Sequence, residues 1–394
     1  IKSKKKTHLN IVWTKVEGVI NSFNKILNYE KFDYKTLIKE TDLYINLIKQ
    51  ISRKSENVLV FSWTLPNFNK GKFLNDFTNE LGVTKNLSIL NNRIAETLKK
   101  EKNIFFINTN YITDQNNTDY NPKYWYLGKI PFTQKIFEVA SEEILKTLNI
   151  LNGKFIKLII VDLDNTLWGG NVGDLGWQNI DLGGHSAAGE AYVDFQKKLK
   201  SLNNLGVQLA ISSKNDEKKA LAVFHKNQNM ILRKKNFISW KINWKDKATN
   251  IKEILKDLNL SAENVLFLDD NLRERMRVKK SIKGINVPDD FDDPFFYTNI
   301  LMNFGDFDLS KSITKEDSKR TKYYKENNRR KKLKEKFFSE DKWLKSLKTA
   351  VKFKKIDSSN FERAIQLLNR VNQMNLSTRR LSQGELANIK KNKK

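Results

Sequence analysis

Short apolar segments alternate with amphipathic ones along the first 150 residues. The apolar run at 58–63 predicts a buried strand that ends before Pro66, and another apolar run predicts a strand at 103–107. Between them, the spacing of apolar residues over 87–100 is typical of an amphipathic helix. This alternation predicts an α/β domain over residues 1–150.

The same alternation begins again after Asn152-Gly153, a pair typical of a turn. The predicted elements are a strand at 157–161, a glycine-rich hairpin-like stretch at 169–184, a helix at 188–204, a strand at 207–212, helices at 216–227 and 247–258, and a strand at 264–268. Strands that alternate with helices form parallel sheets. The predicted fold class is therefore α/β, with a doubly wound parallel sheet in residues 151–308.

The pattern changes after residue 308. Residues 309–349 are highly charged, with helical spacing and no strand pattern, which predicts a helical linker. A strand-like segment at 351–356 and a helix-like segment at 360–372 predict the start of another domain within 350–394. The chain begins at Ile1 without Met and ends in a lysine run, so we expect it to be incomplete at one or both ends.

Composition narrows the class of protein. A chain of 394 residues with 39% hydrophobic and 11% aromatic residues has enough apolar side chains for two or three folded domains. The lack of cysteine excludes disulfides, thiolate metal sites and cysteine nucleophiles. No apolar run approaches the roughly 18 to 20 residues that span a bilayer, and no apolar segment follows the lysine-rich start. We expect a cytoplasmic protein that binds no membrane.

The formal net charge of +27 is distributed unevenly. It is +8 in residues 1–150, +4 in 151–300 and +15 in 301–394, where the run at 329–332 is entirely basic. Proteins that act on nucleic acids concentrate positive charge around the reaction site. The least basic third holds the candidate chemistry, which disfavours a nucleic-acid substrate. The basic tail either reflects solvated helices of a lysine-rich chain or binds an anionic partner.

Carboxylates follow two of the predicted strands. Asp162 and Asp164 come after the strand at 157–161, and Asp269-Asp270 follows the strand at 264–268. Open α/β sheets bind ligands at the carboxyl ends of their strands. Carboxylates gathered at one edge repel one another unless a cation neutralises them, and oxygen-only ligands favour Mg²⁺. The sequence therefore predicts a magnesium site at this edge.

Groups that can hold a phosphoryl group lie between these motifs. The strand at 207–212 leads into Ser212 and Ser213, and Lys247 begins the helix at 247–258. Hydroxyl donors and a lysine are suited to bind phosphoryl oxygens. Together with the carboxylates, they favour phosphoryl-transfer chemistry.

The order of these motifs resembles the haloacid dehalogenase (HAD) superfamily of phosphotransferases. The residues that carry the resemblance are Asp162-Leu163-Asp164-Asn165-Thr166, then Ser213, Lys247 and Asp269-Asp270. The resemblance implies that Asp162 is the nucleophile and forms an aspartyl-phosphate. It implies that Asp164 first protonates the leaving oxygen and then activates water as a base.

The resemblance also implies roles for the other residues. Ser213, with Ser212 as the alternative, would bind a phosphoryl oxygen, and Lys247 would balance charge. Mg²⁺ would be held by Asp162, Asp269, Asp270 and the backbone carbonyl of Asp164. The residues expected to contact the substrate are Thr166, Ser212, Asn215 and Arg275.

The spacing between the motifs leaves no room for the cap domain that small-molecule enzymes of this superfamily insert. The helix at 188–204 follows the glycine-rich stretch directly, and only 34 residues separate Ser213 from Lys247. An open site suits a phosphate presented on a macromolecule, or a site that another domain or protein covers.

At a finer level the chain resembles the FkbH-like branch of the superfamily. The motifs that carry this resemblance lie at 161–170, 189–192, 195–196, 213–215, 242–244, 246–248, 267–271, 274–275, 372–373 and 375–380. The resemblance implies an SGNH-hydrolase-like domain at 1–150, a capless HAD domain, and an acetyltransferase-like (GNAT) domain that begins at 350. It also implies an acyl phosphate substrate, 1,3-bisphosphoglycerate, whose glyceryl unit is placed on an acyl carrier protein for polyketide or surface-polysaccharide assembly.

Three departures bear on that activity. The chain has no cysteine, so any acyl transfer must proceed without a thioester on this protein. The segment 350–394 is too short for a complete acetyltransferase-like domain. The Asp-x-x-His of SGNH enzymes is not found around Asp119 to Tyr124, so we expect the first domain to be structural or to dock partners.

Other interpretations stay open. The same motifs would occur in a capless phosphatase that acts on protein or nucleic acid. They would also occur in a scaffold that has kept the fold without catalysis. Trp168, Trp177, Trp240 and Trp244 either line the open site or belong to the core. His185 is a weaker candidate for substrate contact, and a surface or loop position is the simpler explanation for it. Arg273, like Arg275, is a candidate to balance charge around the metal or to contact phosphate.

Overall fold

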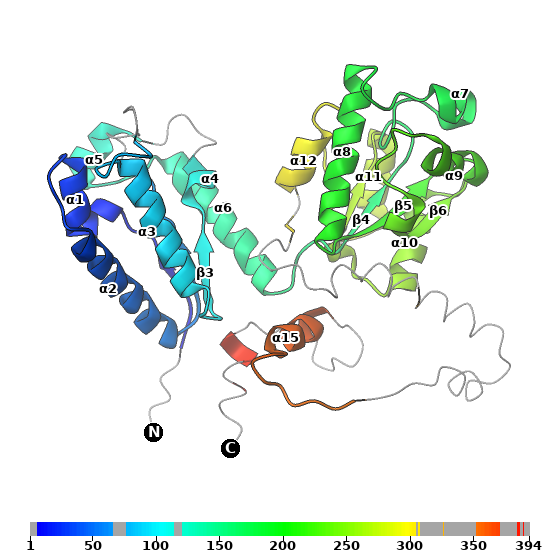
Figure 1. Ribbon diagram of the computed structural model, residues 1–394. Coiled ribbons are helices and arrows are strands. Elements are labelled where there is room, and N and C mark those ends of the chain that lie inside the picture. Colours follow the sequence, from blue (N-terminus) through cyan, green and yellow to red (C-terminus); the bar gives the residue numbers. More distant parts are fainter. Residues whose placement is uncertain are drawn as a thin grey trace. The chain divides into compact units, whose positions relative to one another are not determined.

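The computed structural model of this protein describes residues 6–65, 76–113, 120–304, 306–307, 326, 352–370, 384–386 and 389 (Figure 1). The chain divides into two compact units, the first formed by residues 1–148, 356–370 and 379–394 and the second by residues 149–355 and 371–378. Among the described residues, none of the helices has the length and apolar character needed to cross a membrane.

The described part of the first unit contains a three-stranded parallel sheet in the order β1-β2-β3. The strands are β1 (Thr7–Val12), β2 (Ser55–Phe61) and β3 (Ile104–Ile107). The helices are α1 (Asn21–Leu27), α2 (Tyr34–Arg53), α3 (Val83–Leu98), α4 (Thr109–Thr113), α5 (Pro122–Gly128) and α6 (Gln134–Leu151). Val58 and Val60 pack against α1, α2 and α3, whereas Phe61 packs against α4 and α6. Helices therefore cover both faces of this sheet.

A segment near the carboxyl end of the sequence belongs to the first unit. Helix α15 (Phe361–Arg370) contributes Phe361 and Ile365 to a small apolar cluster with Leu386. The ammonium of Lys102 lies 3.5 Å from the centre of the Phe361 ring. Residues 352–356 form no strand, contrary to their strand-like pattern.

The second unit is built on a parallel sheet in the order β6-β5-β4-β7. The strands are β4 (Leu158–Val161), β5 (Gln208–Ser213), β6 (Phe237–Ile242) and β7 (Val265–Leu268). All residues of β4, β5 and β7 are buried. Continuous burial explains why β4 and β7 are uninterrupted apolar runs, since helices cover both faces of a parallel sheet.

Six helices are described in the second unit. They are α7 (Val172–Asn179), α8 (Ala187–Asn204), α9 (Glu217–Lys226), α10 (Lys247–Leu258), α11 (Leu272–Ser281) and α12 (Tyr297–Phe304). Ile159 and Val161 pack with α8, α9 and α12, whereas Leu158 and Ile160 pack with α10 and α11. Because side chains alternate along a strand, Asp162 is directed to the same face as Ile160, the face that α10 covers.

The glycine-rich stretch holds a helix as well as the predicted hairpin-like contact. Gly169 and Asp181 form an antiparallel bridge with two backbone hydrogen bonds of 2.9 Å. Helix α7 lies between them and is kinked at Gly176, whose φ of +73° favours glycine. The bridge closes the loop that follows β4 before α8 begins.

Most predicted elements of the second unit are present with small shifts at their ends. The predicted strand at 207–212 is Gln208–Ser213, and the predicted helix at 188–204 is Ala187–Asn204. The helix at 247–258 has the predicted bounds. Of the linker predicted at 309–349 only residue 326 is described, and the basic run at 329–332 lies outside the described residues.

Candidate active site

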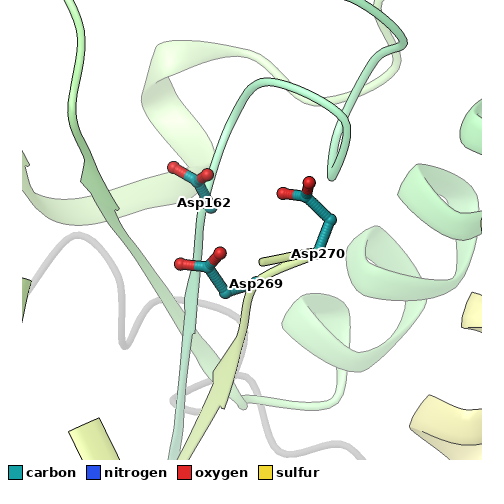
Figure 2. A group of neighbouring side chains, drawn as sticks. All are labelled: Asp162, Asp269 and Asp270. Atoms are coloured by element: carbon teal, nitrogen blue, oxygen red, sulfur yellow. The ribbon is translucent and has the colours of Figure 1, made fainter. Parts of the chain in front are cut away.

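The carboxyl ends of β4 and β7 bring three aspartates together. Asp162 follows β4, and Asp269 and Asp270 follow β7, which pairs directly with β4. One carboxylate oxygen of each lies within 4.8 Å of the others. Figure 2 shows the three carboxylates around one shared space. The gathering of carboxylates predicted from the sequence is therefore present.

Lys247 lies against two of these carboxylates. Its Nζ is 2.9 Å from Asp162 Oδ2 and 2.6 Å from Asp269 Oδ2, and its side chain is 4% exposed. Burial acts to lower the pKa of Lys247, but the charges of Asp162 and Asp269 outweigh burial and raise that pKa above its usual range. The first residue of α10 therefore places a permanent positive charge beside the cluster.

One ammonium does not balance three carboxylates. Burial raises the pKa of Asp270 to about 6, the charge of Asp162 adds to the rise, and Lys247 opposes it. Burial and Asp162 raise the pKa of Asp269 as well, again against Lys247. Asp162 Oδ1 is buried and has no hydrogen-bond partner. A buried carboxylate oxygen without a partner on Asp162, beside two carboxyl groups whose pKa values are raised, fits a hard divalent cation, for which Asp162, Asp269 and Asp270 would be the ligands.

Asp164 faces a different set of groups. Its Oδ1 accepts hydrogen bonds from the Trp168 indole at 2.8 Å and from the Val172 backbone N–H at 3.1 Å, and its Oδ2 accepts one from the Asn215 amide at 2.8 Å. Burial raises the pKa of Asp164, and these donors oppose the rise. Asp164 is thus fixed in one orientation, and its raised pKa favours proton exchange.

The loop between Asp162 and Thr166 has a constrained backbone. Asn165 has a left-handed φ of +55°, a conformation that asparagine tolerates. Its carbonyl accepts a hydrogen bond of 2.9 Å from the Tyr297 hydroxyl, and its side-chain oxygen accepts one from Gly170 N–H. Helix α12, which supplies Tyr297, therefore fixes the turn between the two aspartates. The motif gave no indication of this partner.

Thr166 and Arg275 both contact the Asp269-Asp270 segment. Thr166 is fully buried, and its hydroxyl lies 3.3 Å from Asp270 N and 3.4 Å from Asp270 Oδ1. The Arg275 guanidinium is 2% exposed and donates to the carbonyls of Asp269, Asp270, Phe291 and Asp289. In the structure both side chains contact the Asp269-Asp270 segment, and their predicted contact with the substrate stays a prediction.

The two serines that end β5 are directed to opposite faces of the sheet. Because side chains alternate along a strand, Ser212 is directed to the same face as Ala210, which packs with α10. Ser213 is directed to the same face as Ile211. Both are buried, and Ser212 Oγ has no hydrogen-bond partner. The Asn215 amide donates a hydrogen bond to Asp164, the expected acid and base, and its predicted contact with the substrate stays a prediction.

The tryptophans divide between core and surface. Trp168 is fully buried in the core of the second unit, where its indole also reaches Asp164. Trp177 and Trp240 are partly buried against that core, and Trp244 is 75% exposed in the loop before α10. His185 and Arg273 are exposed. Of the two alternatives, core or wall of the open site, Trp168 takes the core.

Residues 166–247 are all described, and they contain no inserted domain. Only the bridged loop with α7 lies between β4 and α8, and only α9, a short 3₁₀ turn and β6 lie between β5 and α10. Neither of these two described gaps therefore inserts a cap domain over the carboxylates.

One solved structure relates this chain to a characterised class. It is the N-terminal part of the protein BF1531 from Bacteroides fragilis, described as containing a phosphatase domain complexed with Mg. The sequences are 26% identical, the TM-score is 0.67, and the match covers 77% of this chain and 80% of that chain. No family model and no curated protein matches this chain.

This likeness bears on the fold class. The parallel sheet with helices on both faces is the HAD-like phosphatase fold, as the sequence predicted. The SGNH-like and GNAT-like resemblances stay predictions.

Proposed function

We propose that this protein is a Mg²⁺-dependent phosphatase or phosphotransferase that acts through a phosphorylated Asp162. The observation that carries the proposal is the buried cluster of Asp162, Asp269 and Asp270 with Lys247 at the carboxyl edge of the sheet. The similar structure from Bacteroides fragilis contains a phosphatase domain complexed with Mg, which supports both the activity and the metal.

The three carboxylates are the groups that would hold Mg²⁺ in this chain. When bound, Mg²⁺ supplies Lewis-acid stabilisation of phosphoryl charge. Lys247 adds a permanent positive charge on the α10 side. Ser213, or Ser212, which lies on the α10 face and whose Oγ has no hydrogen-bond partner, would donate a hydrogen bond to a phosphoryl oxygen.

Two aspartates divide the covalent chemistry. Asp162 attacks phosphorus, so a bond forms between its carboxylate and phosphorus while the bond to the leaving oxygen breaks. Asp164 gives a proton to that leaving oxygen, and then takes a proton from the water that releases phosphate from Asp162. The raised pKa of Asp164 favours its starting protonated, and Asn215 and Trp168 hold it apart from Asp162.

The finer proposal is an acyl phosphate substrate whose acyl unit passes to an acyl carrier protein. The FkbH-like motifs and the lack of an inserted cap support it, since a carrier protein can deliver or receive a group at an open edge. The +15 charge of residues 301–394 would attract an acidic carrier and raise its association rate. Because the chain has no cysteine, the acyl unit would pass directly to the carrier. In that step a nucleophile of the carrier would attack the acyl carbon, the bond between that carbon and the bridging oxygen would break, and phosphate would leave with that oxygen, so the step would not pass through phosphorylated Asp162.

Phosphate release from acetyl phosphate and p-nitrophenyl phosphate tests the proposed activity. We expect turnover with Mg²⁺, none in EDTA, and none in Asp162→Asn, because the amide keeps the volume of the side chain but cannot attack phosphorus. Thermal unfolding of the variant checks that it folds. Turnover by folded Asp162→Asn would remove Asp162 as the nucleophile, and turnover in EDTA would remove the metal.

A further inference from the structure

Two tyrosine hydroxyls converge on one backbone carbonyl in the loop between Asp162 and Thr166. The Asn165 carbonyl oxygen accepts a hydrogen bond of 2.9 Å from the Tyr297 hydroxyl, and the Tyr192 hydroxyl lies 3.4 Å from the same oxygen. Both tyrosines are buried. Burial raises the pKa of each hydroxyl above its usual range, so both stay protonated and can donate at neutral pH. The loop is therefore held at one point from both α8 and α12.

The carbonyl that they hold belongs to a residue with a left-handed backbone. A φ of +55° is less favourable for Asn165, which has a Cβ, than for glycine. The φ and ψ angles of Asn165 set the angle between two peptide groups, the one that bears the Asp164 carbonyl and the one that Tyr297 holds. Without the Tyr297 bond, Asn165 is freer to relax toward an ordinary conformation, and the Asp164 carbonyl then turns.

The orientation of that carbonyl matters for a cation at this edge. Asp162, Asp269 and Asp270 offer one carboxylate oxygen each. Mg²⁺ takes an octahedral set of oxygen ligands and tolerates little distortion, so backbone carbonyls or waters must supply the remaining ligands. The Asp164 carbonyl is the backbone oxygen that the sequence predicts for this purpose, and a loop that keeps it in one orientation binds the cation at a smaller entropic cost.

Tyr297 is also connected to the other half of the carboxylate cluster. Its ring stacks on Phe291, with ring centres 3.9 Å apart and planes 6° apart. The Phe291 carbonyl accepts a hydrogen bond of 2.8 Å from the Arg275 guanidinium. The same guanidinium nitrogen donates to the carbonyls of Asp269 and Asp270. One set of contacts thus joins the loop after β4 to the segment after β7.

We propose that Tyr297 is a positioning residue for the metal site, whose hydroxyl keeps the loop after β4 in the arrangement that binds Mg²⁺. Tyr297 acts through Asn165: the hydroxyl holds the left-handed turn, and the turn fixes the peptide group of Asp164 before the cation arrives. The affinity for Mg²⁺ therefore depends on a hydroxyl from α12, which supplies none of the carboxylates. This inference rests on the proposed Mg²⁺-dependent function of the same edge.

Titration with Mg²⁺ tests the role without turnover. Tyr297→Phe removes the hydroxyl and keeps the ring that stacks on Phe291. In calorimetric titration of the metal-free protein at pH 7.5, we expect the Kd for Mg²⁺ to rise about fivefold, the usual contribution of one neutral hydrogen bond. Tyr192→Phe should raise it less, because its hydroxyl lies farther from the Asn165 oxygen. An unchanged Kd in Tyr297→Phe overturns the positioning role and leaves the proposed function in place, whereas no binding by the wild type overturns both.

A matched control lies in the first unit. Tyr44 is buried and its hydroxyl shares a hydrogen bond of 3.0 Å with the Thr14 hydroxyl, so Tyr44→Phe also removes one hydrogen-bonded tyrosine hydroxyl. Thermal unfolding without metal should show lower stability for both variants, whereas only Tyr297→Phe should bind Mg²⁺ more weakly. A Kd raised as much in Tyr44→Phe would show that weaker binding follows from lost stability, and would overturn the assignment.

Phosphatase rates separate metal binding from the later chemistry. With p-nitrophenyl phosphate, the Mg²⁺ concentration that gives half the maximal rate should rise about fivefold in Tyr297→Phe, and saturating Mg²⁺ should restore the wild-type rate. A loss of rate that saturating Mg²⁺ does not restore would overturn the role, because Tyr297 would then act on the fold or the chemistry. If the wild type hydrolyses no phosphate, the proposed function fails and the titration with Mg²⁺ decides the role of Tyr297 alone.

Discussion

Lys247 shows how a single residue sets the charge of the site. It is the first residue of α10, and Asp246 caps that helix by accepting a hydrogen bond from Thr249 N–H. The helix dipole adds partial positive charge at this end, next to Asp162 and Asp269. The carboxylates are therefore held close together before any metal binds, at the cost of a buried ammonium that depends on both partners.

Removing that ammonium should destabilise the fold. Lys247→Met leaves Asp162 and Asp269 buried without a cationic partner, and loss of one partner of a buried pair costs about 3 to 5 kcal/mol of unfolding free energy. Urea unfolding at pH 7.5 without divalent metal measures the loss, which should be smaller at pH 5 because the carboxylates then take up protons. Lys241→Met, which breaks a more exposed pair, should unfold close to the wild type. Equal stability of Lys247→Met and the wild type would contradict the charge assignment.

The raised pKa values of Asp269 and Asp270 predict two effects of raising the pH. The metal-free protein should lose stability, and the stabilisation by Mg²⁺ should increase. A carboxyl group whose pKa is raised by folding stabilises the folded state at low pH, and that contribution is lost as pH rises through about 6, the pKa of Asp270. Mg²⁺ needs the ionised carboxylates, so it should raise Tm more at pH 7.5 than at pH 5. Scanning calorimetry at both pH values checks this. Asp270→Asn should reduce the difference between the Mg²⁺-induced rises of Tm at the two pH values. An equal rise of Tm at both pH values in the wild type would contradict the prediction.

The sequence was sufficient to place Asp162, Asp269 and Asp270 together, since each follows an apolar run that is a buried strand in the structure. The sequence did not indicate the hydrogen-bond partners of Asn215 and Arg275, which the motifs suggest as substrate contacts. Asn215 bonds Asp164, and Arg275 bonds backbone carbonyls that belong to segments far apart in the sequence. Such partners depend on the folded backbone and have no periodic signature.

At the scale of elements, the loop after β4 determines which groups surround Asp164. The bridge between Gly169 and Asp181 brings the loop back to the sheet, so α7 begins beside Asp164 and Val172 N–H reaches its carboxylate. Glycines and turn residues in this stretch predicted a hairpin. The helix between them was missed because it is short and interrupted at Gly176. Strand β1 was missed because Thr7–Val12 is largely exposed and mixed in polarity.

The close packing of α8 on this loop can be tested at one glycine. A Cβ on Gly189 would lie 2.5 Å from the Gly183 carbonyl oxygen and 2.7 Å from Asp181 Oδ1, so Gly189→Ala must push the loop away. We expect a loss of about 1 to 3 kcal/mol in unfolding free energy. Gly184→Ala is the matched control, because a Cβ there meets nothing within 4 Å and should leave stability unchanged or slightly raised. Similar stabilities for the two variants would contradict the described packing.

At the scale of the whole molecule, the second unit supplies every group that the proposed chemistry uses. Its sheet places Asp162, Asp164, Ser213 and the Asp269-Asp270 segment at one edge, and α10 adds Lys247. The alternation of strands and helices predicted this arrangement, because all the motifs follow strands of one parallel sheet. The contribution of the basic carboxyl-terminal third was predicted from charge alone, and its run at 329–332 lies outside the described residues.

The central claim is that Asp162 becomes phosphorylated during turnover. Acid quenching of the enzyme with acetyl phosphate and Mg²⁺, followed by intact-mass measurement and peptide mapping, tests it most directly. We predict one phosphoryl group on the peptide that contains Asp162, and none in EDTA or in Asp162→Asn. Phosphate release with no phosphoryl group on that peptide at any quench time, or with the group on another residue, would contradict the account.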